Sequence, residues 1–204
     1  MKADFILRQH VSDTNRNGDR ITRDQFTDDM QLWQRFQAGD REAFCAMYAR
    51  HFSVLYHYGL QMVRDRELVK DAIQNFFIYL WEHREGLGKV QVLKAYLLVG
   101  LRRTMIRQAR EAGKLLHTID EDDKWPEIAT EEPNVHLAWE TRETHRELQA
   151  ALSQLSQRQQ EVLHLKFHAG LSYSQIAEVL NLKKDNVSYH IRQAFEKLRE
   201  VMGT

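Results

Sequence analysis

The sequence predicts an all-α protein in which two small helical domains are joined by an acidic linker. The 204-residue chain has only nine glycines and two prolines, a composition that disfavours a many-turned β-sandwich. Apolar residues recur three and four positions apart in both halves of the chain, which is the spacing of a buried helix face. The length suffices for one ordinary domain or two small ones, and a change in composition between the halves favours two.

Charge is balanced overall but unevenly distributed. The 29 basic and 29 acidic residues cancel, so net charge alone argues against a basic nucleic-acid-binding protein. However, Lys89–Lys114 holds seven basic residues and one acidic residue, whereas Asp120–Glu132 holds seven acidic residues and one basic residue. Acidic residues together with Pro126 and Pro133 are typical of a solvated linker. We predict an N-terminal extension over residues 1–28, a first domain over 29–112, a linker over 113–135 and a second domain over 136–204.

The first domain is predicted to begin with two helices. Gln31–Gln37 reads as a short amphipathic helix that ends where Gly39 can adopt the left-handed conformation. Asp40 is a suitable N-cap for a longer second helix. One face of that helix is apolar or small: Phe44, Tyr48, Phe52, Leu55, Gly59 and Val63.

A third helix is predicted over Glu67–His83. Its core stripe is Val69, Ala72, Ile73, Phe76 and Leu80. Phe77, Ile78 and Trp81 lie off this stripe, so the apolar arc is wider than one buried face requires. Two interpretations stay open: either the helix packs on two sides within the domain, or the extra arc docks onto another protein together with Asp71, Gln74 and Asn75.

A fourth helix, Leu93–Ala112, follows the loop Arg84–Val92. Its inward positions are predicted to be Leu93, Tyr96, Leu97, Gly100, Leu101 and Ile106. Its outward positions are predicted to be Lys94, Arg102, Arg103, Arg107 and Arg110. A basic face with Tyr96 and Trp81 nearby can hold a phosphate backbone and stack bases. Because the excess charge has one sign, we favour nucleic-acid binding over a merely solvated face.

The second domain carries helix-start signals. Ser156–Gln159 and Ser172–Gln175 are both capping boxes. The first of these helices carries Val162, Leu163, Leu165 and Phe167 as its apolar residues and stops at Gly170. Asn181 ends the second helix in a left-handed turn. The third helix begins near Lys184 without a conventional side-chain cap, so Asp185 is expected to support its first turn through the helix dipole.

A short helix, a tight turn and a longer helix with a polar start form a helix-turn-helix pattern. Polar side chains near the start of the last helix can reach base edges and phosphates in a major groove. They are Lys184, Asn186, Ser188, Tyr189, Arg192 and Gln193. We therefore favour DNA binding over a plain three-helix bundle with a polar surface.

Three segments of the second half form an ordered series: Gln154–Val162, Gly170–Glu178 and Val187–Arg199. They resemble, in this order, the opening, middle and close of region 4 in a known family, the extracytoplasmic-function (ECF) sigma factors of bacterial RNA polymerase, which belong to the sigma-70 family. Ser188 and Tyr189 stand where the family has more basic residues, which implies a promoter preference particular to this chain.

The first half resembles sigma region 2. The similar segments are Gly39–Phe44, Asp71–Trp81 and Lys94–Leu97. Asn75 stands where the family usually has Glu, so one polymerase contact is expected to differ. The likeness runs from about Asp29 to Met202, which leaves the N-terminal extension unexplained.

The resemblance implies a promoter-recognition subunit with no active site of its own. We also expect no metal site and no cofactor. The third helix would bind the β′ clamp helices of core polymerase through Asp71, Gln74, Asn75, Phe77 and Trp81. The loop and the fourth helix would capture the non-template strand of the minus-10 element through Lys94, Tyr96, Arg102, Arg103 and Arg107. The last helix would read minus-35 DNA while its domain sits on the β flap, and the acidic linker would run toward the RNA exit path.

Two other functions and one further partner are also considered. The second hypothesis is a dimeric helix-turn-helix regulator that acts without being a polymerase subunit, and a third is a protein-interaction adaptor. Because the family often works under an anti-sigma factor, such a factor is a further implied partner. No apolar run reaches 18 residues and the first ten residues lack a signal-peptide pattern, so we expect a cytoplasmic protein without membrane insertion.

Overall fold

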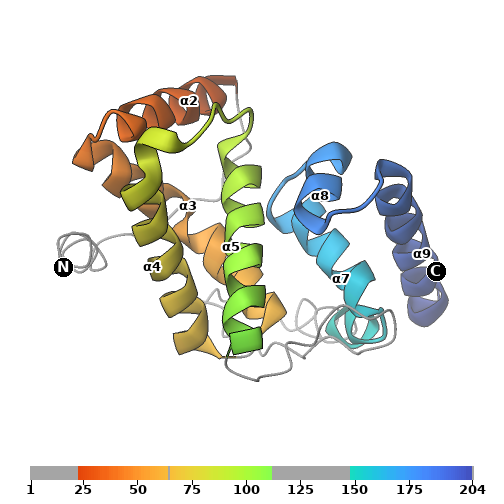
Figure 1. The fold of residues 1–204 in the computed structure, drawn as a ribbon. Coiled ribbons are helices and arrows are strands. Elements are labelled where there is room, and N and C mark those ends of the chain that lie inside the picture. Colours follow the sequence, from red (N-terminus) through yellow and green to blue (C-terminus); the bar gives the residue numbers. More distant parts are fainter. Residues whose placement is uncertain (1–22, 64, 112–147, 204) are drawn as a thin grey trace, which may run out of the picture. The chain divides into compact units, whose positions relative to one another are not determined.

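The computed structural model describes residues 23–63, 65–111 and 148–203 (Figure 1). Most of the predicted N-terminal extension and the whole predicted linker lie outside these residues. Within them, every regular element is helical. The described residues divide into two compact units, 23–59 with 65–111 and 60–63 with 148–203. The predicted all-α, two-domain fold class is confirmed.

Helix α2, Arg23–Gln37, begins eight residues before the predicted start at Gln31. Its second half carries the buried apolar residues Leu32, Trp33 and Phe36, which produce the periodicity that predicted a helix there. Asp28 and Asp29, which precede the predicted start, bind α3 through charged side chains. Arg50 pairs with Asp28 and, at 2.9 Å, with Asp29, and His51 lies 3.5 Å from the Asp29 carboxylate.

Helix α3, Arg41–Met62, starts as predicted. The Asp40 carboxylate accepts hydrogen bonds from the backbone N–H groups of Glu42 and Ala43 at 2.9 and 3.2 Å. Gly39 precedes this cap with a φ of 86°, a left-handed conformation that suits glycine. The cap and the glycine together fix the sharp change of direction between α2 and α3.

Helix α4, Arg66–His83, carries its predicted stripe on the inside. Phe77 is also fully buried, and its ring packs edge-on against Phe44 and Tyr48 of α3 at centroid distances of 5.9 and 4.9 Å. The interpretation of α4 as a helix packed on two sides is therefore correct at Phe77. The prediction that the Phe77 side chain is available to another protein is wrong, because the extra width of the apolar arc is filled from within the domain.

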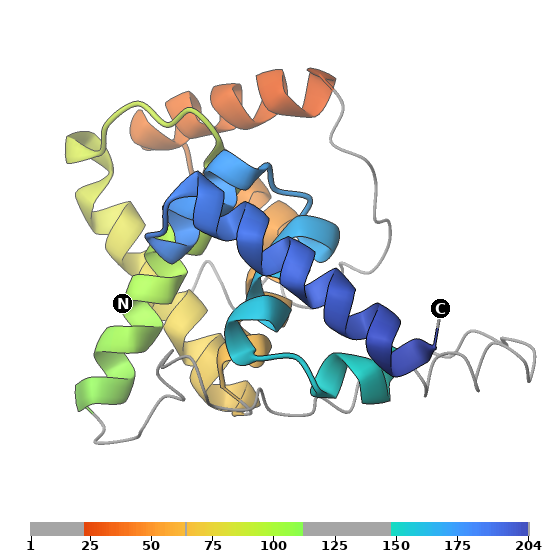
Figure 2. The same cartoon turned by 90° about the vertical axis from the view of Figure 1, so that its right-hand side faces the viewer.

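Helix α5, Leu93–Glu111, follows the short 3₁₀-helix η1, Arg84–Gly86, and a loop. It runs beside α4, and α2 lies across the end of this pair where the loop is found (Figures 1 and 2). The two helices approach closely at Gly100, where a Cβ atom would lie 2.2 Å from the Phe76 ring. Leu93, Leu97 and Leu101 are buried as predicted, whereas Tyr96 and Ile106 are only half-buried.

The second unit contains α7, Gln157–Leu163, then a π-helical turn η2, His164–His168, then α8, Tyr173–Leu180, and α9, Lys184–Met202. Both predicted capping boxes are formed, and Asn181 ends α8 with φ 54° and ψ 47°. Lys183 gives α9 no side-chain cap, and Asp185 lies in its first turn, as predicted.

The first predicted helix of the second domain is not α-helical throughout. It is α-helical to Leu163 and continues as the π-helical turn η2 to His168, and Gly170, with a φ of 70°, follows as the predicted stop. Leu165 in this turn is fully buried, so Phe167, two positions later, points to the opposite side. Phe167 is 65% exposed, and its ring meets the Phe195 ring edge-on at a centroid distance of 5.9 Å.

Candidate nucleic-acid interface

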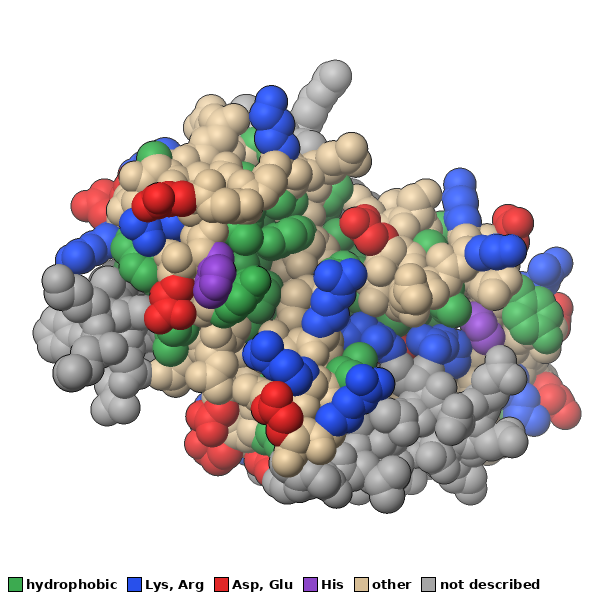
Figure 3. Space-filling model, viewed as in Figure 1, with side chains coloured by type: hydrophobic (Ala, Val, Ile, Leu, Met, Phe, Trp, Pro, Cys, Tyr) green, Lys and Arg blue, Asp and Glu red, His purple; other side chains and the backbone are tan. Residues whose placement is uncertain are grey.

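One face of α5 brings together three of the five residues predicted to bind the minus-10 strand. Tyr96, Arg103 and Arg107 are separated by seven and four positions, so they lie along the same side of the helix. Arg103 and Arg107 are exposed, and Tyr96 is half-buried. Basic side chains gather over α5 in Figure 3. This face joins an aromatic ring to two guanidinium groups, which is the chemistry that single-stranded nucleic acid requires.

The other two predicted residues of this group, Lys94 and Arg102, lie elsewhere on α5. Both are half-buried. Burial lowers the pKa of the Lys94 ammonium, and the opposing influence of the Asp29 carboxylate is smaller. Lys94 is two positions before Tyr96, which turns it to the opposite side of the helix. The structure therefore does not gather all five side chains on one surface.

Tyr79 of α4 is a residue that the sequence analysis missed. Phe76 of α4 touches Gly100 of α5. Tyr79 is about one turn after Phe76 on α4, and Tyr96 is about one turn before Gly100 on α5. Both tyrosines are therefore displaced from this contact toward the loop that joins the two helices. The two tyrosines are thus neighbours across the α4–α5 seam. Burial and the nearby Tyr79 raise the pKa of the Tyr96 hydroxyl, while Arg103 lowers it. Tyr79 is 48% exposed.

The seam has a definite stacking geometry. The Tyr79 ring lies 4.1 Å from the His83 ring at an interplanar angle of 26°. Figure 3 shows a strip of hydrophobic side chains between the acidic edge over α4 and the basic side chains over α5. We define Tyr79, Tyr96, Arg103 and Arg107 as the seam surface.

An exposed aromatic residue near the end of α4, off the core stripe, was the sequence signal that could have revealed Tyr79.

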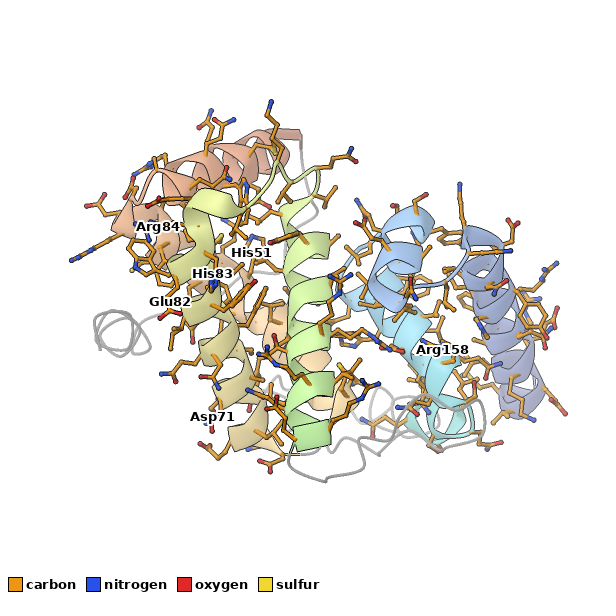
Figure 4. The ribbon with its side chains drawn as sticks, viewed as in Figure 1. His51, Asp71, Glu82, His83, Arg84 and Arg158 are labelled. Atoms are coloured by element: carbon orange, nitrogen blue, oxygen red, sulfur yellow. The ribbon has the colours of Figure 1, made fainter. Side chains whose placement is uncertain are left out.

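The outer face of α4 carries the predicted polar contacts. Asp71 and Asn75 are exposed and Gln74 is half-buried. Figure 4 shows Asp71 and Glu82 on the edge of α4 that faces away from α5. This outer face is acidic and polar, unlike the seam surface, so the two sides of α4 suit different partners.

Trp81 is held within the domain more than the sequence suggested. Its ring packs against Phe44 at 5.1 Å and Phe36 at 6.3 Å, and the Arg84 guanidinium lies 4.9 Å from its centre. Arg84 also donates a hydrogen bond to the Trp81 carbonyl oxygen at 2.8 Å. Trp81 therefore joins the end of α4 to η1 and leaves only part of its surface free.

The start of α9 presents the predicted recognition residues. Lys184, Asn186, Tyr189 and Arg192 are exposed, while Ser188 and Gln193 are half-buried. The opposite face is buried through Val187, Ile191 and Ala194. This arrangement holds the helix by its apolar side and leaves its polar side open to a partner.

Two of these side chains are already engaged within α9. The Ser188 hydroxyl donates to the Lys184 carbonyl oxygen at 3.2 Å, and the Gln193 amide donates to the Glu196 carboxylate at 2.6 Å. Asn186, Tyr189 and Arg192 are consequently the better placed groups for contacts with base edges.

A buried ion pair supports the second unit. Arg158 donates to the Glu161 carboxylate at 3.2 Å, and Glu161 is only 1% exposed (Figure 4 labels Arg158). Burying one member alone would leave a charge without its partner, which is far more costly than the pair. Sequence periodicity could not identify this pair, because both residues are usually found at the surface.

Among the described residues, no three His, Cys, Asp or Glu side chains come together to hold a metal ion. Within the same ranges, no helix combines the length and apolar character needed to cross a bilayer.

Family models match both units. Residues 47–115 match the model for sigma-70 region 2, and residues 151–200 match the model for sigma-70 region 4. Together the two matches cover more than half of the chain. The ECF RNA polymerase sigma factor SigL of Mycobacterium tuberculosis is 28% identical over 158 residues, which are 76% of this chain and 85% of that protein. The ECF RNA polymerase sigma factor SigK of Mycolicibacterium vanbaalenii is 23% identical over 168 residues, covering 80% of this chain and 84% of that protein.

Two solved structures share the fold. CnrH in complex with the cytosolic domain of CnrY has a TM-score of 0.59 and 20% identity, covering 86% of this chain and 97% of that one. The sigma factor RpoE of Bartonella quintana, crystallised with the anti-sigma factor NepR, has a TM-score of 0.51 and 16% identity, covering 90% of this chain and 99% of that one. At this level of identity, these similarities establish the fold alone.

The two helical units and the ordered matches to regions 2 and 4 define the class: the chain belongs to the sigma-70 family. Within that family it is an ECF-type sigma factor, a protein that directs RNA polymerase to promoters. A dimeric helix-turn-helix regulator that acts without polymerase is not favoured, since such a regulator would have no need of a region 2 domain.

Proposed function

We propose that the two units, with boundaries near residues 29–112 and 136–204, bind promoter DNA as parts of an RNA polymerase holoenzyme. In this proposal the protein is cytoplasmic, has no catalytic activity of its own and needs no cofactor. The single observation that carries the minus-10 assignment is the seam surface, where Tyr79 and Tyr96 adjoin Arg103. Bases of a melted strand can stack on the rings while the guanidinium groups of Arg103 and Arg107 hold its phosphates.

The outer face of α4 is the proposed contact with the β′ clamp helices. Its exposed Asp71 and Asn75, with the half-buried Gln74, offer hydrogen-bonding groups, and Asp71 lies on the edge of α4 that faces away from α5 (Figure 4). Phe77 is not part of this contact, because it is fully buried. Trp81 contributes only the part of its ring that Arg84 and the aromatic core leave open.

The second unit is the proposed reader of minus-35 duplex DNA, with its domain on the β flap. Its α9 helix exposes Lys184, Asn186, Tyr189 and Arg192 on one side, and that polar start suits the major groove. Lys184 is suited to a phosphate, whereas Arg192 can form two hydrogen bonds to a guanine.

An anti-sigma factor is a further proposed partner. The support is that one of the similar structures holds the sigma factor RpoE of Bartonella quintana together with the anti-sigma factor NepR.

The experiment that tests the proposal is reconstitution of this chain with core RNA polymerase on fragmented genomic DNA from its source organism. Transcript 5′ ends are mapped with and without the chain. We expect a discrete set of new start sites, each preceded by a shared pair of elements near minus 10 and minus 35. A chain that neither binds core polymerase nor adds start sites would refute the proposal.

A further inference from the structure

The loop Leu87–Val92 between η1 and α5 has little packing of its own. Gly88, Lys89 and Gln91 are exposed, and a Cβ atom at Gly88 would meet nothing within 4 Å. Val90, only 7% exposed, is the buried anchor within the loop. A short exposed loop with so few contacts requires hydrogen bonds from other elements to keep one conformation.

Helix α2 supplies two such hydrogen bonds. The indole N–H of Trp33 donates to the Gly88 carbonyl oxygen at 3.2 Å, and the Gln37 amide donates to the Leu87 carbonyl oxygen at 2.5 Å. Trp33 and Gln37 are four positions apart, so they reach the loop from one face of α2. They hold the carbonyls of two consecutive residues, which fixes the orientation of the peptide planes at the start of the loop.

Trp33 also connects the loop to the seam surface. Its ring is 1% exposed and meets the edge of the Tyr96 ring at a centroid distance of 5.2 Å and an interplanar angle of 68°. One side chain of α2 therefore touches both the backbone of the loop and the aromatic residue at the start of α5. A shift of the loop relative to Tyr96 would break one of these contacts.

We propose that Trp33 and Gln37 are positioning residues that hold the loop in the conformation in which it receives single-stranded promoter DNA. This inference rests on the proposed function of the loop and the seam surface. Helix α2 contributes no residue to the seam surface, but in this inference it has a defined role in promoter opening. It fixes the conformation of the loop before DNA binds, so that binding does not have to order the loop.

The test compares Gln37→Met with Gln34→Met. Methionine has nearly the length of glutamine but cannot donate a hydrogen bond. Gln34 is an exposed residue one turn earlier on α2, so the same change there is the matched control. Gln37→Lys, which restores a donor, is the rescue variant, with Gln34→Lys as the control for its charge.

The first readout is independent of DNA. Hydrogen exchange of the Trp33 indole N–H, followed by NMR and assigned with Trp33→Phe, reports whether the loop stays on α2. We expect exchange to accelerate about fivefold in Gln37→Met, corresponding to the loss of one hydrogen bond. Gln34→Met should leave the exchange rate unchanged. Equal exchange in the two variants would overturn the claim that Gln37 holds the loop.

The second readout uses holoenzyme on a promoter mapped in the reconstitution experiment. Gln37→Met should weaken binding to that promoter with a pre-melted minus-10 bubble about fivefold, with core polymerase affinity unchanged and Gln37→Lys recovering most of the loss. An equal loss of core binding would make α2 a general support and contradict the inference. If wild-type chain yields no promoter at all, the proposed function fails, while the exchange measurement still decides whether α2 holds the loop.

Discussion

Phe76 of α4 packs directly over Gly100 of α5, where a Cβ atom would lie 2.2 Å from the aromatic ring. This contact sets how closely the two helices approach, and Tyr79 and Tyr96 lie about one turn beyond it on the side of the loop. The absence of a side chain at Gly100 is therefore a condition for the seam surface to form.

Substitution of Gly100 tests this packing. Gly100→Ala should destabilise the protein by about 1–2 kcal/mol, because overpacking costs more than the gain in helix propensity. Urea denaturation followed by circular dichroism measures the change. Gly86→Ala is the control, since a Cβ atom there meets nothing within 4 Å. Similar stability of the two variants would show that α4 and α5 separate at little cost.

Tyr79 is expected to stack on a base of the melted strand. Tyr79→Ala should weaken binding of holoenzyme to a bubble promoter by about 1–3 kcal/mol, whereas Tyr79→Phe retains the ring and should lose little. Fluorescence of 2-aminopurine placed along the minus-10 strand identifies the stacked position. If Tyr79→Ala instead reduces affinity for core polymerase, Tyr79 belongs to the polymerase contact and the seam surface is assigned incorrectly.

Arg103 is expected to contact a phosphate. Arg103→Ala should reduce the slope of log affinity against log salt concentration by about 0.7 for single-stranded DNA, the contribution of one phosphate. The measurement is a salt titration of holoenzyme binding to the bubble promoter. Arg41→Ala, at an exposed arginine in the first turn of α3, is the control. An unchanged slope for Arg103→Ala would remove Arg103 from the DNA-binding face.

Asp29 makes the stability of the first unit depend on pH. Burial raises the pKa of its carboxyl group, but hydrogen bonds and charge from His51 and Arg50 outweigh this and hold the pKa below 3.8. The folded-state pKa is depressed, so the ionised carboxylate contributes stability above the unfolded pKa, and that contribution is lost as pH falls through the folded value. Asp29→Asn should therefore lower stability near neutral pH and flatten the decline in acid.

Urea denaturation repeated across the acid range measures this dependence. Asp71→Asn, at an exposed residue on the outer face of α4, is the comparison and should follow the wild-type curve. If Asp29→Asn keeps the wild-type acid slope, the ion pairs between α2 and α3 do not contribute to stability.

Arg192 is expected to read a base, and Lys184 a phosphate. Arg192→Ala should relax discrimination at one minus-35 position by about 1–3 kcal/mol, whereas Lys184→Ala should weaken all promoters nearly equally. Transcription from a library of minus-35 variants measures both effects. A uniform loss in Arg192→Ala would reassign it to the backbone.

Local chemistry in the sequence predicted much of this fold. The capping boxes at Ser156 and Ser172, the Asp40 cap and the left-handed Asn181 all depend on neighbours within a few residues, and all are confirmed. The recognition face of α9 follows equally from helical spacing.

Features that depend on tertiary contacts were not predictable in this way. Phe77 is buried against the rings of α3, and Asp28 and Asp29, before the predicted start of α2, pair with Arg50 of α3. The neighbourhood of Tyr79 and Tyr96 depends on the Phe76–Gly100 approach, and Phe167 is turned outward by the π-helical turn. Lys94 and Tyr96 are close in sequence, but a separation of two positions places them on opposite sides of α5.

The central claim is that this chain directs core polymerase to promoters and holds their melted minus-10 strand on the seam surface. Permanganate footprinting of unpaired thymines, on a promoter mapped with this chain, tests it most directly in holoenzymes carrying wild type or Tyr79→Ala with Arg103→Ala. We predict a reactive minus-10 bubble with wild type, and its loss in the double variant although core polymerase is still bound. A bubble of wild-type intensity in the double variant would contradict the account.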